Sequence, residues 1–160
     1  MKIYCPSCFY PNESDIDICE KCGSKIEWKE QSYEDKLIKA LSHKDYRIVL
    51  RAAQILSNFK SDKTIVALTN IIFSNNDPYI QETAVSSLAN MYTEGVPQVI
   101  KKIALSGFLP ARLKAIEAMG QKSCIKDLYL LEKLKYDSSP SIKAKAEEAI
   151  KKLKERHHLK

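Results

Sequence analysis

Glycine, histidine and long apolar runs are all scarce in this sequence. Its 160 residues include four glycines and three histidines, which leaves little material for the many tight turns of a strand-rich fold. The most apolar stretch, residues 64–73, contains Thr64 and Asn70 and is far shorter than the roughly 20 residues that cross a bilayer. These absences favour a helical fold and exclude a transmembrane span.

Signals for export and for catalysis are missing as well. Cys5 comes before any apolar segment could form, so we expect no secretory signal and place the protein in the cytoplasm. The glycines stand too far apart for a phosphate-binding loop. None of the histidines lies in a pattern suited to general acid–base catalysis. We therefore expect no enzymatic activity, no small-molecule substrate and no membrane partner.

The net charge of +6 is unevenly distributed. Residues 1–30 carry 4 lysines and 6 acidic residues, and residues 31–100 carry 7 basic and 7 acidic residues. Residues 101–160 carry 15 basic and 7 acidic residues, a net charge of +8. A basic C-terminal third is typical of a segment that attracts nucleic acid or an acidic partner, and a solvated lysine-rich surface explains it equally well.

Four of the five cysteines form two Cys-x-x-Cys pairs near the N-terminus, namely Cys5, Cys8, Cys19 and Cys22. Each pair brings two thiolates together, and two facing pairs supply the tetrahedral set that zinc prefers. Because four thiolates leave no open coordination position, a bound zinc ion would be structural. About 30 residues bury too little apolar surface to fold alone, and zinc binding, worth roughly 10–16 kcal/mol, offsets that shortage.

The two pairs followed by Gly23 resemble the short zinc ribbons of bacterial and archaeal proteins. The resemblance covers Tyr4 to about Trp28 and departs from the pattern at Phe9, where such ribbons often carry glycine. It implies a small zinc-binding domain over residues 1–30.

Three alternatives for these cysteines stay open. Iron also occupies four-thiolate sites, as in rubredoxin. Two disulfides require an oxidising compartment, which the missing export signal argues against. A redox-active Cys-x-x-Cys pair normally sits in a βαβ context that this sequence does not show. We predict that the fifth cysteine, Cys124, is an ordinary helix residue.

An apolar stripe centred on alanine recurs four times in the rest of the chain. The central alanines are 32, 31 and 31 residues apart. Apolar residues four positions apart share one face of a helix, and a small central residue lets a neighbouring helix approach. Each copy therefore predicts the second helix of a hairpin, with the stripes Ile48–Ala52–Leu56, Ile80–Ala84–Leu88, Ala111–Ala115–Met119 and Ile142–Ala146–Ile150.

Helix-capping residues support this placement of the second helices. Asp45, Asp77 and Ser139 stand seven positions before three of the alanines, where a side chain can accept from the free amides of a helix start. The third copy has Phe108 at this position and is the weakest. First helices are expected over residues 33–42, 63–74, 95–106 and 123–136.

The Asp-x2-Ile-x3-Ala-x3-Leu pattern of residues 45–56 and 77–88 resembles HEAT repeats, in the short variety named after phycobilisome lyases. The resemblance covers roughly Tyr33 to Leu153. It implies an all-α fold, an α-solenoid of about four helical hairpins over residues 31–160. The end repeats of such an array need covers. We expect the ribbon to cover the first repeat, with Trp28 at the junction, and the charged segment 143–156 to form a polar face at the other end.

In HEAT-like arrays the second helices line the concave face. Positions one before and six after each central alanine lie away from the buried stripe and stack from repeat to repeat. They form a polar, mostly basic ladder of Arg51, Thr83, Lys114, Lys145, Asn58, Asn90, Gln121 and Lys152, to which Arg47 and Tyr79 add the N-terminal position of the first two copies. From this ladder we select as partner-binding residues Arg47, Arg51, Asn58, Tyr79, Asn90, Lys114 and Lys145.

These features together predict a non-enzymatic adaptor in which a structural zinc module accompanies a groove for a protein or peptide. The ladder can donate hydrogen bonds to an extended peptide or to phosphates. Nucleic-acid binding through the basic face and the C-terminal third is therefore the alternative. A lyase or lesion-processing activity, found in some HEAT-like proteins, is a further alternative that rests on the resemblance alone.

Overall fold

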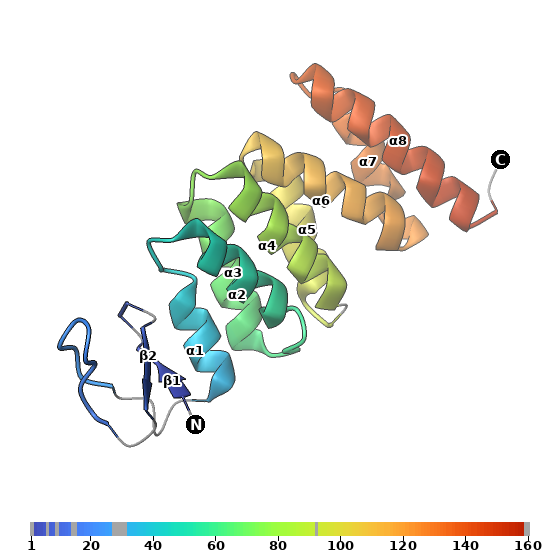
Figure 1. Ribbon diagram of the computed structural model, residues 1–160. Helices are drawn as coiled ribbons and strands as arrows, with labels where there is room; N and C mark the ends of the chain where they lie inside the picture. The colour runs from blue at the N-terminus through green and yellow to red at the C-terminus, as the bar shows by residue number, and fades with distance from the viewer. Residues whose placement is uncertain are drawn as a thin grey trace.

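In the part of the chain that the structure describes, eight α-helices follow one another in antiparallel pairs after a small N-terminal module (Figure 1). This computed structural model describes residues 2–5, 7, 8, 10–13, 16–26, 32–91 and 93–158. The predicted α-solenoid of four helical hairpins is confirmed. None of the helices in the described part of the chain is long and apolar enough to cross a membrane.

The first two hairpins consist of α1 (Tyr33–Ala40), α2 (Tyr46–Leu56), α3 (Asp62–Ser74) and α4 (Pro78–Met91). The last two consist of α5 (Val96–Ser106), α6 (Leu109–Lys122), α7 (Leu128–Leu134) and α8 (Pro140–Arg156). The even-numbered helices carry the alanine-centred stripes, as the sequence predicts.

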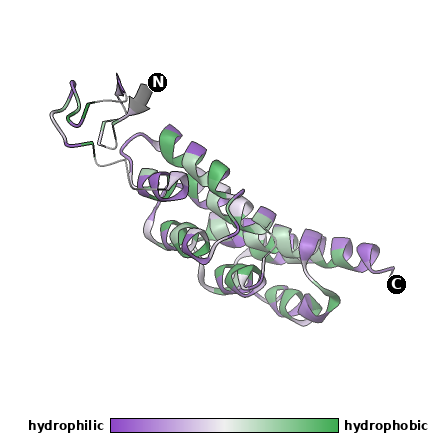
Figure 2. Cartoon of the chain, turned by 90° about the horizontal axis from the view of Figure 1, so that it is seen from below, coloured by the Kyte–Doolittle hydropathy of each residue, from purple (hydrophilic) through white to green (hydrophobic). Residues whose placement is uncertain are grey.

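The stripes form the core of the array. Eleven of the twelve stripe residues are buried, and Ile48 is half-buried against the same core. Each second helix packs directly on the next, whereas the first helices are further apart from one another. The second helices are therefore the more tightly stacked layer. Figure 2 shows that hydrophobic and hydrophilic stretches alternate along the helices.

Two of the predicted caps form, and the third does not. The Asp45 carboxylate accepts a hydrogen bond from the Arg47 amide at 3.0 Å, and the Asp77 carboxylate accepts from the Tyr79 amide at 2.8 Å. Ser139 occupies the N-cap position of α8, but its side chain makes no capping bond. The carboxylate of Asp137 instead accepts from the Ser139 amide at 2.9 Å and fixes the turn.

The start of the fourth hairpin differs from the prediction of one helix over residues 123–136. A 3-10 turn, η1 (Ile125–Asp127), precedes the shorter α7. Asp127 is buried and pairs with Lys101 of α5 at 2.8 Å, which ties this turn to the preceding repeat. Cys124 lies before the turn in extended conformation and is exposed, so its assignment as a helix residue is wrong.

The N-terminal module has its own small core. Strands β1 (Lys2–Tyr4) and β2 (Pro11–Glu13) pair antiparallel, and a bridge joins Ile18 to Lys25. Its buried residues, Cys5, Cys19 and Ile26, form a cluster separate from the solenoid core. Trp28 lies outside the described residues, so its packing at the junction and the boundary near residue 30 stay predictions.

Candidate metal centre and partner-binding groove

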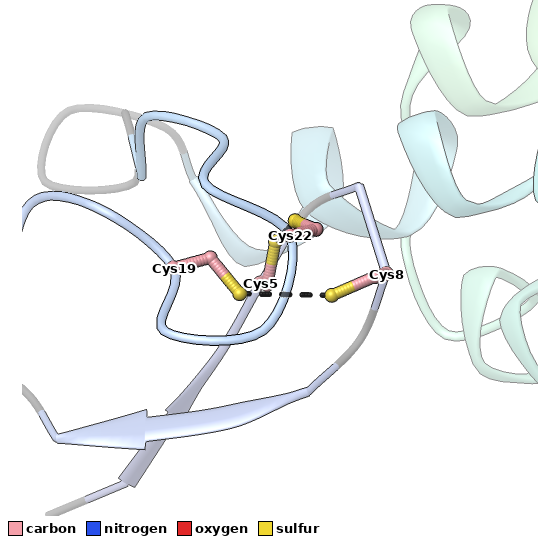
Figure 3. A group of neighbouring side chains, drawn as sticks. All are labelled: Cys5, Cys8, Cys19 and Cys22. Carbon is pink, nitrogen blue, oxygen red and sulfur yellow. Dashed lines mark hydrogen bonds between the residues drawn. The ribbon is translucent and has the colours of Figure 1, made fainter.

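The four cysteines of the N-terminal pairs converge on one point (Figure 3). Their sulfur atoms all lie within 4.8 Å of one another, and the shortest separations are 3.5 Å between Cys5 and Cys22 and 3.6 Å between Cys8 and Cys19. Four sulfurs at about 2.3 Å from a tetrahedral zinc ion would be about 3.8 Å apart. The spacing therefore suits a tetrathiolate metal site, and the four cysteines can hold a metal ion.

Backbone hydrogen bonds shape the two turns that carry these cysteines. The Cys5 amide donates to the Tyr10 carbonyl at 2.9 Å, and the Cys19 amide donates to the Ser24 carbonyl at 2.9 Å. In the second turn Gly23 has a φ of +70°, a conformation that residues with a Cβ rarely adopt. The turns leave Cys5 and Cys19 buried, while Cys22 is exposed.

The side chain of Asn12 in β2 forms hydrogen bonds with both turns and is 2% exposed. Its side-chain amide donates to the Tyr10 carbonyl at 2.7 Å and lies 3.7 Å from the Cys19 sulfur, while its carbonyl oxygen accepts from the Glu20 amide at 3.1 Å. Sequence reasoning missed this residue. Its signal is weak, because one asparagine between a proline and a glutamate has no spacing pattern.

The thiols differ strongly in acidity. The Ser24 hydroxyl and amide lower the pKa of Cys22 to about 6. The backbone amide of Tyr10 lowers the pKa of Cys8, but burial and the three neighbouring cysteines outweigh it and raise this pKa to about 12. Four clustered thiols cannot all ionise unless a cation offsets their mutual repulsion, and a bound metal ion supplies that charge.

A polar groove crosses the second helices α2, α4 and α6. One cavity of 440 Å³ is lined by Gln54, Ser57, Glu82, Thr83, Ser86, Ser87, Asn90 and Lys114. A second cavity of 300 Å³ shares Ser86, Asn90 and Lys114 with the first and continues along α6 to Glu117 and Gln121. The groove is therefore continuous over three repeats and presents amide, hydroxyl and charged groups.

The structure brings two of the seven predicted partner-binding residues into this groove, Asn90 and Lys114. The other five are not among the residues that line it: Arg47, Arg51, Asn58, Tyr79 and Lys145. Tyr79 and Arg51 are nevertheless exposed on second helices, so the ladder is wider than the groove.

Sequence reasoning missed a third column of groove residues, two positions after each central alanine. This position lies about 200° around the helix from the alanine, next to the two predicted columns at about 240° and 260°. It reads Gln54, Ser86, Glu117 and Glu148, of which the first three line the groove and Glu148 holds the equivalent position in α8. The same repeat phase that gave the other two columns would have found it.

The acidic members of this column pair with lysines of the polar, mostly basic ladder. Lys114 pairs with Glu117 at 2.9 Å, and Lys145 pairs with Glu148 at 2.7 Å. Lys152 also reaches Glu148, at 2.6 Å. Lys145 and Lys152 lower the pKa of Glu148 to about 2, so its carboxylate stays charged and neutralises the lysines around it.

The N-terminal arginines of the ladder differ from each other. Arg47 forms a two-point contact with Asp45, with Nη2 2.7 Å from a carboxylate oxygen. Hydrogen bonds from the Arg47 side chain and backbone lower the pKa of Asp45 to about 2. Arg51 is exposed, and no carboxylate among the described residues pairs with it. Arg51 is thus the more available cation of the two.

Comparison with known protein families agrees with this architecture. Residues 18–89 and residues 34–120 each match the model of HEAT repeats, and the second match alone spans more than half of the chain. No curated protein matches the sequence significantly. The four alanine-centred hairpins and the family match lead to one conclusion: the chain belongs to the HEAT-repeat family.

Proposed function

We propose that this protein is a non-enzymatic adaptor that binds an extended peptide segment of a partner protein in the groove over α2, α4 and α6. The observation that carries the proposal is the continuity of this groove, in which Gln54, Asn90 and Gln121 of three successive repeats offer side-chain amides. Amides can both donate to and accept from a peptide backbone. HEAT repeats also commonly form protein-binding scaffolds, which supports a protein partner.

A structural zinc ion in the cysteine cluster is the second part of this proposal. All four donors are thiolates, which zinc and iron both accept, and no ligand position is left for substrate or water. The expected cytoplasmic setting keeps thiols reduced, which favours a metal site over disulfides, and zinc is the ion that we propose. The ion would hold the N-terminal module folded and take no part in chemistry.

A nucleic-acid partner is less favoured than a peptide. The ion pairs of Lys114 and Lys145 with carboxylates reduce the charge available for phosphates. We expect little retention on single-stranded or duplex DNA at about 50 mM salt. Strong retention that falls steeply toward about 200 mM salt would identify phosphate contacts and replace the peptide proposal.

The peptide proposal is tested by selecting ligands from a displayed random peptide library with the zinc-loaded full chain. Affinities of the selected peptides are then measured for Asn90→Ala and Lys114→Ala. Matched controls on the first helices are Asn70→Ala in α3, which is exposed like Asn90, and Lys135→Ala at the C-terminal end of α7, which is half-buried and pairs with Glu132 as Lys114 pairs with Glu117.

We expect each groove variant to bind roughly tenfold more weakly, because a hydrogen bond to the peptide is lost, while the controls stay within about twofold. Thermal unfolding of each variant checks that the fold is retained. If no peptide is selected, or if groove and control variants lose affinity equally, the groove is not the binding surface.

A further inference from the structure

A mostly apolar cavity opens beside one end of the polar groove. It has a volume of 450 Å³ and lies between the C-terminal ends of α4 and α6, the start of α5 and the turn η1. Its apolar walls come from Ala89, Val96, Pro97, Ile100 and Ala118. Pockets of this size with mostly apolar walls are typical of binding sites.

The repeat pattern explains why the cavity exists. The position seven residues after the central alanine is Phe59, Met91 and Leu153 in the first, second and fourth copies. Met91 and Leu153 are fully buried, and Phe59 packs half-buried against the core. The third copy has Lys122 at this position, so the apolar side chain that fills the other repeats is absent.

Lys122 does not replace that side chain in the core. Its ammonium group donates to the Ala89 carbonyl at 2.7 Å and to the Asn90 side-chain oxygen at 2.9 Å, both at the end of α4. The lysine therefore lines the cavity and leaves its apolar walls uncovered. An empty apolar site of this kind is filled most favourably by a side chain like those in the other copies.

The charges around the cavity favour a neutral occupant. Among the described residues that line it, the four charged side chains, Glu94, Lys101, Lys122 and Asp127, sum to zero. Lys101 and Asp127 pair with each other at 2.8 Å. Because these charges sum to zero, the lining gives no net attraction for an ion, whereas an apolar side chain can be buried against the apolar walls.

The cavity adjoins the polar groove. Ala89, Ala118 and Lys122 line both the cavity and the adjoining 300 Å³ end of the groove. A segment that crosses α4 and α6 in the groove therefore reaches the mouth of the cavity with its next side chains.

We propose that the cavity receives a leucine, methionine or phenylalanine side chain of the extended peptide that lies in the groove. This inference rests on the proposed function and adds to it the anchor residue that selects the partner. Binding energy in interfaces concentrates on a few such buried anchors. The groove would bind the backbone of the peptide, and the cavity would bind and select its apolar anchor side chain.

The pocket itself is tested with N-acetyl-leucinamide as the probe and N-acetyl-alaninamide as the comparison, on the zinc-loaded full chain. Backbone amide NMR shifts of Val96, Ile100 and Ala118 report binding. We expect the leucine probe to bind roughly tenfold more tightly than the alanine probe, because more apolar surface is buried.

Two variants of one residue separate pocket filling from loss of charge. Lys122→Leu restores the apolar side chain of the other repeats and should abolish the shifts. Lys122→Gln removes the charge, keeps a hydrogen-bond donor and should retain them. If Lys122→Leu proves unstable, Ala118→Leu closes the same cavity from α6 and should also abolish the shifts. Equal shifts in wild type and the filled variants, or none in wild type, overturn the proposal.

A second, independent experiment uses the peptides selected for the groove. Replacing their leucine, methionine or phenylalanine by alanine should weaken binding to the wild-type chain about tenfold and leave binding to Lys122→Leu unchanged. If the original peptides bind wild type and Lys122→Leu with equal affinity, the cavity does not hold an anchor residue, but the groove proposal stands. Loss of binding in Asn70→Ala as in Asn90→Ala would count against the groove and leave the probe result on the cavity unaffected.

Discussion

At the scale of single residues, Gly120 permits a close contact between α6 and α8. A Cβ atom placed on Gly120 would lie 2.7 Å from the Cα and 2.9 Å from the Cβ of Ala149 in α8. No methyl group fits at these distances without a shift of one helix. The third and fourth repeats therefore pack together because both residues at this crossing are small.

We expect Gly120→Ala to destabilise the protein by about 1–3 kcal/mol, the range for overpacked cores. Urea unfolding followed by circular dichroism measures this change. Adding Ala149→Gly should recover part of the loss, although a glycine within α8 itself costs up to about 1 kcal/mol. A Gly120→Ala protein as stable as wild type would show that the helices are not this close.

Some functional residues could be read from the sequence, while others depend on contacts far along the chain. The central alanines and the four cysteines follow fixed spacings, so their roles are visible in the sequence. Gly120 and Lys122 gain their roles from α8 and α4, each about thirty residues away. The sequence shows a glycine inside a helix and a lysine at an apolar repeat position, but not which element each of them contacts. Asn12 was missed for the same reason, because it connects two turns that only the fold brings together.

At the scale of elements, the helix starts also show how far the sequence can predict the structure. Asp77 was predicted as a cap from its position, and it accepts from both the Tyr79 and Ile80 amides. Ser139 holds the equivalent position and makes no such bond. The spacing identified both helix starts correctly, but it could not reveal that the Ser139 side chain makes no capping bond, nor that Asp137 accepts from the Ser139 amide before the helix.

The two cap positions therefore serve as a matched pair. Asp77→Ala should cost about 1 kcal/mol, because two amides at the start of α4 lose their acceptor. Ser139→Ala should change the free energy of unfolding by no more than a few tenths of that amount. Urea unfolding of both variants checks the difference, and equal losses would contradict the observed geometry.

An ion pair joins the turns of the third and fourth hairpins and makes stability depend on pH. Arg112 of α6 contacts the Asp137 carboxylate at 2.5 Å and donates to the Ala104 carbonyl at 2.9 Å. The Arg112 guanidinium is the main cause that lowers the pKa of Asp137 below its ordinary value of 3.8. The charged form of Asp137 is therefore the one that stabilises the fold.

We expect Asp137→Asn to cost about 1.5–3 kcal/mol at neutral pH, the range for hydrogen bonds to charged groups. Because the folded pKa is depressed, the contribution is complete above about pH 5 and is lost as the pH falls through the folded pKa. The difference between wild type and variant should thus shrink below about pH 4. In an Arg112→Ala background this pH dependence should largely disappear, and its persistence would assign it to another group.

The whole molecule combines two different means of stabilisation. The solenoid buries its stripes between neighbouring repeats, and each repeat depends mainly on those beside it. The repeat spacing was sufficient to predict this architecture. The N-terminal module buries only Cys5, Cys19 and Ile26 as its apolar core within the described residues, so its proposed stability comes from the metal. The zinc-ribbon and short phycobilisome-lyase assignments remain predictions.

Removal of the metal should therefore affect the two parts unequally. We expect one zinc ion per chain by elemental analysis, and none in Cys19→Ser. Chelation or this substitution should abolish the dispersed NMR signals of residues 2–26, because binding energy of roughly 10–16 kcal/mol is lost. The helical circular dichroism should stay near the wild-type level, since the solenoid core is separate.

Cys124→Ser is the matched control for this experiment, because Cys124 is exposed and lies outside the cluster. It should retain the zinc ion and the signals of the module. If chelation instead melts the helices together with the module, the two cores are energetically one unit, and the junction around Trp28 must transmit the stability of one to the other. If iron is found in place of zinc, the structural role stands, but the assignment of the ion is wrong.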